Sequence, residues 1–168
     1  MTILNTAHSF YLASKRCLEM RETGKNSFEM LMLPAIVNLS FAAELYLKYL
    51  IEQKGEKVKG HNLKKLFNNL EEEHKICIIS IFDKIQNNKQ DRMKKVPSNV
   101  AEKLNIKKHL DLIEKNFYKD FDALIDQQAD SFVDWRYLHE NENFRHINLN
   151  LLFSICDGAR EVISGKKE

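Results

Sequence analysis

Glycine and proline are scarce in this chain, and their scarcity limits the folds it can adopt more than any other feature. Of the 168 residues, 5 are glycine and 2 are proline. Sandwiches and barrels of short strands need a turn about every ten residues, and such turns are rich in both residue types. Long helices exclude both from their interiors. The sequence therefore predicts an all-α fold.

Length and composition indicate one globular domain, residues 1–168. Hydrophobic residues make up 43 % of the chain and charged residues 30 %, a balance that supports a packed core rather than disorder. The 3 cysteines lie far apart, which predicts neither a zinc site nor a disulfide framework. The first residues do not resemble a signal peptide, and the longest uncharged apolar stretch, 31–37, is too short to span a membrane. We expect a cytoplasmic protein without membrane association.

Apolar residues at spacings of three and four predict an up-and-down-like bundle of five or six helices, two of them long and central. The predicted helices cover 5–22, 27–54, 63–70, 76–82, 105–128 and 143–163. The clearest one begins between Ser27 and Pro34, ends before Gly55, and carries a regular apolar stripe. That stripe consists of Ile36, Leu39, Ala43, Leu47 and Leu50.

Three further segments of the bundle have specific predictions. The helix around 76–82 has two candidate inward faces, which are Ile76, Ile79 and Phe82 or, alternatively, Ile78 and Ile81. A short segment, 132–140, is expected to start at Ser131 with Asp134 as its capping-box partner. The polar and basic stretch 87–105 is predicted to be an exposed loop.

The chain lacks the sequence motifs of several common enzyme classes. It has no glycine-rich phosphate loop, no Gly-x-Ser-x-Gly elbow and no His-Glu-x-x-His pair, so P-loop enzymes, dinucleotide oxidoreductases, α/β-hydrolases and zincins are excluded. The other histidines show no spacing typical of a metal site. We expect neither a metal nor a cofactor.

The segment 132–140 contains the densest group of polar residues that could bind phosphate or transfer a proton. On a helix, Arg136, His139 and Glu140 would share one face at spacings of three and four. The guanidinium can bind phosphate, the imidazole can move a proton near neutral pH, and the carboxylate can orient either one. The alternative is a salt-bridged helix surface, with Trp135 and Tyr137 anchoring the core.

Glu44 and Lys48 form a second polar group, one helical turn apart in the apolar run 41–51. A charge in such a run must be paired or near a cleft because burying it alone is costly, although a routine surface pair is the alternative. His61 follows Gly60 and is either a helix-start residue or part of a site. The lysines around it form either a basic rim for phosphates or a solvated loop; they are Lys57, Lys59, Lys64 and Lys65.

Three segments together resemble the HEPN superfamily, the higher eukaryote and prokaryote nucleotide-binding domains. They read Ser40-Phe-Ala-Ala-Glu-Leu-Tyr-Leu-Lys-Tyr-Leu-Ile51, Gly60-His61-Asn62-Leu63-Lys64-Lys65-Leu66 and Trp135-Arg136-Tyr137-Leu138-His139-Glu140. The resemblance implies a helical bundle that commonly dimerises. It also implies a link to metal-independent ribonucleases of defence or toxin–antitoxin systems, in which the RNA's own 2′-hydroxyl attacks the adjacent phosphate.

The usual HEPN ribonuclease motif, an Arg followed by a His after four to six residues, is absent here, because those positions after Arg136 hold Asn141, Glu142 and Asn143. The resemblance then implies a variant catalytic group of Arg136, His139 and Glu140. It implies substrate binding by Glu44, Lys48, His61 and Tyr137. The expected partners are RNA or a nucleotide, a second copy of the chain, and an antitoxin or other protein. The alternative function is a non-catalytic binding or scaffold module that acts through protein–protein contacts as a dimer.

Overall fold

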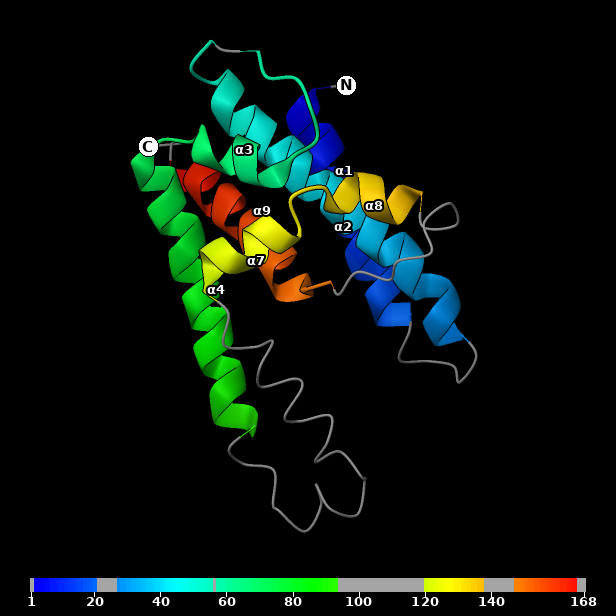
Figure 1. Cartoon of the computed structure of the whole chain (residues 1–168). Coiled ribbons are helices and arrows are strands. Elements are labelled where there is room, and N and C mark those ends of the chain that lie inside the picture. Colours follow the sequence, from blue (N-terminus) through cyan, green and yellow to red (C-terminus); the bar gives the residue numbers. More distant parts are fainter. Residues whose placement is uncertain (1, 21–26, 56, 94–119, 138–146, 166–168) are drawn as a thin grey trace.

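The computed structural model describes residues 2–20, 27–55, 57–93, 120–137 and 147–165 (Figure 1). Over these residues the chain forms seven helices and no strand, which confirms the all-α prediction. The helices are α1 (Ile3–Met20), α2 (Ser27–Glu52), α3 (Leu63–Asn68), α4 (Glu72–Met93), α7 (Phe121–Gln127), α8 (Ser131–Arg136) and α9 (Leu149–Gly165).

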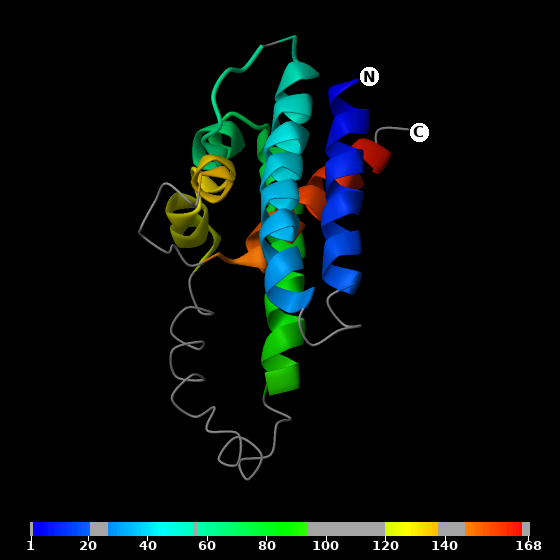
Figure 2. The same cartoon turned by 90° about the vertical axis from the view of Figure 1, so that its right-hand side faces the viewer.

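Helix α2 is the centre of the arrangement. It runs antiparallel beside α1, while α3, α7 and α8 lie on its opposite side (Figure 2). Helix α9 passes between α2 and α4 and contacts both (Figure 1). Ala7, Ala42 and Ala43 are fully buried, and their small side chains suit a close approach of α1 and α2.

The apolar stripe predicted for α2 is buried along its whole length. Gly55 closes the end of the helix with a φ of +83°, a conformation that favours glycine. Pro34 lies inside α2 on an exposed part of its surface, where its missing N–H leaves the carbonyl of Met30 without its helical partner. By length and composition Leu31–Glu52 could cross a membrane. In this fold, 56 % of an 18-residue window of this segment is buried inside the bundle, so its apolar residues build the core.

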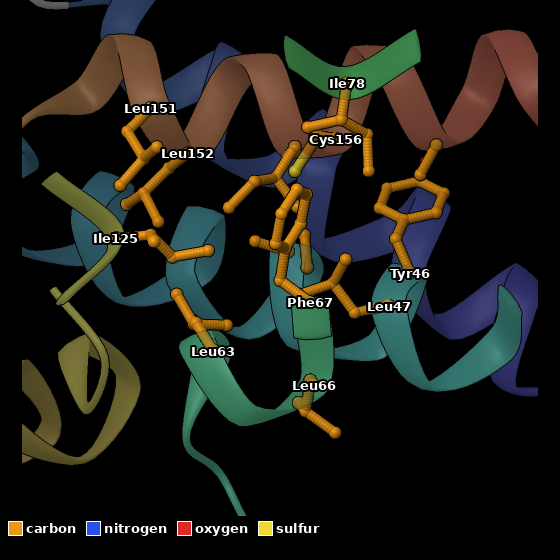
Figure 3. Close-up of a cluster of buried hydrophobic side chains, with 14 of the residues drawn as sticks. Tyr46, Leu47, Leu63, Leu66, Phe67, Ile78, Ile125, Leu151, Leu152 and Cys156 are labelled. Atoms are coloured by element: carbon orange, nitrogen blue, oxygen red, sulfur yellow. The ribbon is translucent and has the colours of Figure 1, made fainter. Parts of the chain in front are cut away.

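The core contains side chains from six helices, which are α1, α2, α3, α4, α7 and α9. Figure 3 shows the part of it that includes Tyr46, Leu47, Leu63, Phe67, Ile78, Ile125, Leu151, Leu152 and Cys156. A six-residue helix such as α3 is not stable alone, and the burial of its Leu63, Leu66 and Phe67 holds it against α2.

Helices α4 and α9 cross with their backbones almost in contact. A Cβ atom placed on Gly158 would lie 2.7 Å from the Cα atom of Ile78 and 2.8 Å from its Cγ1 atom. Real Cβ atoms essentially never approach other heavy atoms that closely. Only glycine fits at this crossing, and its absent side chain makes room for Ile78, which is fully buried.

The buried face of α4 is a mixture of the two predicted alternatives. Ile78 and Phe82 are buried, whereas Ile76 is 60 % exposed, so the inward position predicted for Ile76 is wrong. Within 72–87, the part of α4 whose side chains the structure describes, the buried residues recur at every fourth position, and they are His74, Ile78, Phe82 and Gln86. Two of the four are polar, so a search for apolar residues alone does not find this stripe.

Several element boundaries differ from those predicted. Helix α4 continues to Met93, into the stretch predicted as a loop, while 94–105 lie outside the described residues. Of the helix predicted at 105–128, the described part is α7, whose N-cap Asp120 accepts a hydrogen bond from the Ala123 N–H. Helix α9 starts at Leu149 rather than at 143, because the Asn148 side chain accepts a hydrogen bond from the Leu151 N–H.

Candidate functional site

Glu44 is the most deeply buried charged residue of the candidate site, with 1 % of its side chain exposed. Lys48, one turn further along α2, donates from Nζ to Glu44 Oε1 over 2.7 Å. Its own side chain is 14 % exposed. The expectation that a charge in this apolar run is paired is therefore confirmed, and the pair lies where α2 meets the α3 and α8 side of the bundle.

His61 is the second partner of the Glu44 carboxylate. Its Nδ1 atom lies 3.0 Å from both Oε1 and Oε2 of Glu44. A carboxylate only accepts hydrogen bonds, so Nδ1 is the donor in this contact and Nε2 is the ring nitrogen that faces away from Glu44. The His61 side chain is 49 % exposed. This places a carboxylate-oriented imidazole at the surface, directly after the turn that Gly60 makes with a φ of +100°.

Phe132 of α8 joins Arg136 to this cluster. Its ring stacks on Phe41 of α2, with the centroids 4.5 Å apart, and its centroid lies 5.8 Å from that of His61. The guanidinium carbon of Arg136 lies 5.1 Å from the same ring. One aromatic side chain therefore contacts both His61 and Arg136, which come from distant parts of the sequence. Phe132 lies in the segment 132–140, but as an apolar residue it carries no sequence signal of a role in a site.

Tyr137 flanks Arg136 on the surface. The guanidinium carbon lies 4.4 Å from the Tyr137 ring centroid, and Nη2 donates a hydrogen bond of 2.5 Å to the Tyr137 hydroxyl. Tyr137 is 36 % exposed, so it does not anchor the core. In the described part of the chain no carboxylate forms an ion pair with Arg136, and its contacts are aromatic rings and this hydroxyl.

The predicted helical face of Arg136, His139 and Glu140 is not formed by α8. The helix ends at Arg136, and Tyr137 is its C-cap with φ −107° and ψ 27°. His139 and Glu140 lie outside the described residues, so their assignment as catalytic residues stays a prediction. The predicted capping box is also wrong, because Asp130 rather than Ser131 occupies the N-cap position.

A separate group of buried polar residues lies between α1, α2 and α9. Tyr11 donates to Asp157 Oδ1 over 2.6 Å, and the hydroxyl of Tyr46 lies 2.5 Å from Nδ1 of His8. Burial, with the hydrogen bond to Asp157, raises the pKa of Tyr11 above its ordinary value. Burial raises the pKa of Tyr46 in the same direction and that of the Cys156 thiol well above its usual range. These groups stay neutral at physiological pH.

Metal binding finds no support in the part of the chain that the structure describes. There, no three or more His, Cys, Asp or Glu side chains group together in a way that could hold a metal ion. The Glu44 cluster consists of one ammonium group and one imidazole on a single buried carboxylate, and Phe132 contacts both this imidazole and the Arg136 guanidinium.

The class of protein defined by this fold is an all-helical bundle with a polar cluster on its central helix. The HEPN domain family model matches residues 4–108, more than half of the chain. The chain belongs to the HEPN family. Glu44, Lys48 and His61 lie within the matched region, whereas Arg136 and Tyr137 lie beyond it. Neither the curated proteins nor the solved structures contain a match to the chain.

Proposed function

We propose that this HEPN protein binds RNA or a nucleotide at the surface formed by α2, the start of α3 and α8. The observation that carries the proposal is the shared contact network of Glu44, Lys48 and His61, beside which Phe132 places Arg136. Buried charged groups are expensive to maintain, and a cluster of them next to an exposed imidazole and guanidinium is typical of a functional site.

Unpaired lysines around His61 support a polyanionic ligand. Lys57, Lys59 and Lys65 are exposed, and among the described residues none of the three forms an ion pair. Lys64, by contrast, is neutralised by Asp126 at 2.8 Å. Unpaired lysines within a few residues of His61 in the sequence can neutralise several phosphates, and this neutralisation is the main source of affinity for nucleic acid.

Tyr137 supports single-stranded RNA in particular. Its exposed ring lies against the Arg136 guanidinium, and exposed aromatic rings beside cations stack unpaired bases. We assign Arg136 to phosphate binding, His61 to the ligand's hydroxyl or phosphate oxygens, and Tyr137 to base stacking. Lys48 neutralises the Glu44 carboxylate from inside the site. Glu44 orients Lys48 and His61.

Metal-independent RNA cleavage is the second candidate function, and the Glu44–His61 contact favours it. With Nδ1 held by the carboxylate, His61 Nε2 can accept the proton of a ribose 2′-hydroxyl. The 2′-oxygen then bonds to the adjacent phosphorus, the bond to the 5′-oxygen breaks, and the leaving oxygen takes a proton from water. The products are a 2′,3′-cyclic phosphate and a 5′-hydroxyl. Arg136 would stabilise the negative charge that develops on the phosphate oxygens.

Labelled single-stranded RNA tests both candidates in one assay, with EDTA present. We would compare the wild type with Arg136→Ala and His61→Ala, and with Arg16→Ala as a control that removes an exposed arginine from α1. Binding lost in Arg136→Ala and kept in Arg16→Ala supports the site. Cleavage to cyclic phosphate ends by wild type, and not by His61→Ala, supports the ribonuclease.

The alternative function is distinguished by the same experiment. Wild-type protein that leaves RNA both uncleaved and unbound would overturn the proposal and favour the helical scaffold module. A homodimer and a protein partner such as an antitoxin are part of the proposal as well. Sedimentation equilibrium of the purified chain tests the dimer directly, and a monomer at micromolar concentration would contradict it.

A further inference from the structure

Three consecutive residues, Asn62 to Lys64 at the start of α3, each bind the segment 126–130, which comprises the end of α7 and the turn before α8. Asn62 Nδ2 donates to Asp130 Oδ1 over 3.0 Å, and the Leu63 N–H donates to the Ala129 carbonyl over 2.6 Å. Lys64 pairs with Asp126. These contacts form a continuous seam between two parts of the chain that are far apart in sequence.

Asn62 has two functions in this seam, and its side-chain amide performs both because it has an acceptor oxygen and a donor nitrogen. Its Oδ1 atom accepts a hydrogen bond of 2.9 Å from the Lys65 N–H, which caps α3. Its Nδ2 atom donates to Asp130 at the same time. An aspartate at this position would keep the cap but could not donate. Asp130, at the N-cap position of α8, makes no side-chain cap bond to its own helix, so its carboxylate is used for the seam instead.

The seam joins the two segments that carry the candidate phosphate-binding side chains. Asn62 directly follows His61, and Asp130 directly precedes α8, which carries Phe132 and Arg136. We propose that Asn62 and Asp130 are positioning residues, whose hydrogen bond holds α8 in the register that places Arg136 beside His61. This inference rests on the proposed RNA-binding function, and it adds that RNA affinity depends on the pair rather than on either residue alone.

A swapped pair tests this directly. In Asn62→Asp two carboxylates face each other and the donor is lost, and in Asp130→Ala the acceptor is lost. The double variant Asn62→Asp/Asp130→Asn restores one donor and one acceptor in the reverse direction, with the net charge of the wild type. We expect each single variant to bind single-stranded RNA about fivefold more weakly, the loss of one hydrogen bond. The double variant should recover to within about twofold of wild type.

A readout of site geometry separates this proposal from the RNA-binding proposal. The carbon-bound ring protons of His61, observed by NMR, report its position against the Phe132 ring with or without RNA. They should shift in both single variants and return in the double variant. Asn68→Asp, at the other end of α3, adds the same negative charge away from the seam and should leave them unchanged.

The outcomes distinguish the two ideas. If wild type fails to bind RNA while the His61 signals shift and return as expected, the RNA-binding function fails and the positioning role stands. Unchanged His61 signals in both single variants would overturn the positioning role. So would a double variant that stays as perturbed as Asn62→Asp, because the pair would then not act as a unit.

Discussion

Glu44 illustrates what a charged residue requires in the middle of an apolar helix. Its carboxylate is almost fully buried, yet both oxygens have partners, one from the same helix and one from the loop before α3. Removing one partner from a buried pair leaves an uncompensated charge and destabilises the fold. The cluster therefore couples local stability to the geometry of the candidate site.

Tyr11 and Tyr46 make stability depend on pH at the alkaline end. Their pKa values are raised in the folded state, whereas an unfolded tyrosine has a pKa of about 10. Below that pH both states are protonated and the stabilisation is complete. Above it the unfolded state releases protons that the folded state retains. The free energy of unfolding should therefore fall by about 1.4 kcal/mol per pH unit for each tyrosine.

Urea denaturation followed by circular dichroism between about pH 9 and pH 11 checks this prediction. Tyr46→Phe should have the shallower pH dependence, even though it loses the hydroxyl contact with His8 and is less stable at neutral pH. Equal slopes for wild type and variant would show that the buried hydroxyl does not control alkaline stability.

At the scale of elements, the close crossing of α4 and α9 depends on one glycine, Gly158, which has no side chain. A methyl group on Gly158 would overlap both the backbone and the side chain of Ile78. Gly158→Ala should lower the free energy of unfolding by about 1–3 kcal/mol, the cost of overpacking, despite the better helix propensity of alanine. Differential scanning calorimetry would record this as a lower Tm.

Gly165→Ala is the matched control, because nothing lies within 4 Å of a Cβ atom at that end of the same helix. It should leave the Tm unchanged or slightly raised. Ile78→Ala in the Gly158→Ala background should recover only part of the loss, since one of the two close contacts is to the Ile78 backbone. A Gly158→Ala protein as stable as wild type would mean that the helices separate at little cost.

At the scale of the molecule, α2 links the hydrophobic core to the candidate site. One side of it packs on α1, and the other side meets α3 and α8 where the polar cluster lies. Three exposed lysines flank His61 of that cluster in the sequence, and they are Lys57, Lys59 and Lys65. A strand of RNA lying over this surface would displace counterions from several phosphates.

The salt dependence of RNA affinity should therefore change when these lysines are removed. Each of Lys57→Ala and Lys59→Ala should reduce the slope of log K against log salt by about 0.7, the value for one phosphate of a single strand. Fluorescence anisotropy over a salt series measures it. Lys75→Ala, whose lysine is paired with Glu72 on α4, should leave the slope unchanged. Equal slopes in all three variants would place the RNA elsewhere.

Much of the fold could be predicted because helix periodicity is a local property. The span and buried face of α2 agree with the apolar stripe, and the Glu44–Lys48 pair follows from the one-turn spacing of two side chains on a helix. The sequence leaves the α4 face between two alternatives, and the observed face takes Ile78 from one and Phe82 from the other, because two of its four buried residues are polar. Whether a polar residue is buried depends on its neighbours in the tertiary structure. The pattern of residues within one helix carries no information about those neighbours.

The sequence by itself determined an all-helical chain with a long apolar central helix that carries one charged pair. Only the tertiary structure decided that His61, 17 residues from Glu44, shares its carboxylate, and that Phe132 joins Arg136 to the same cluster. Helix formation depends on residues three and four apart, so it can be read along the chain. The site depends on how α2, α3 and α8 pack against each other, and that packing is a property of the whole core.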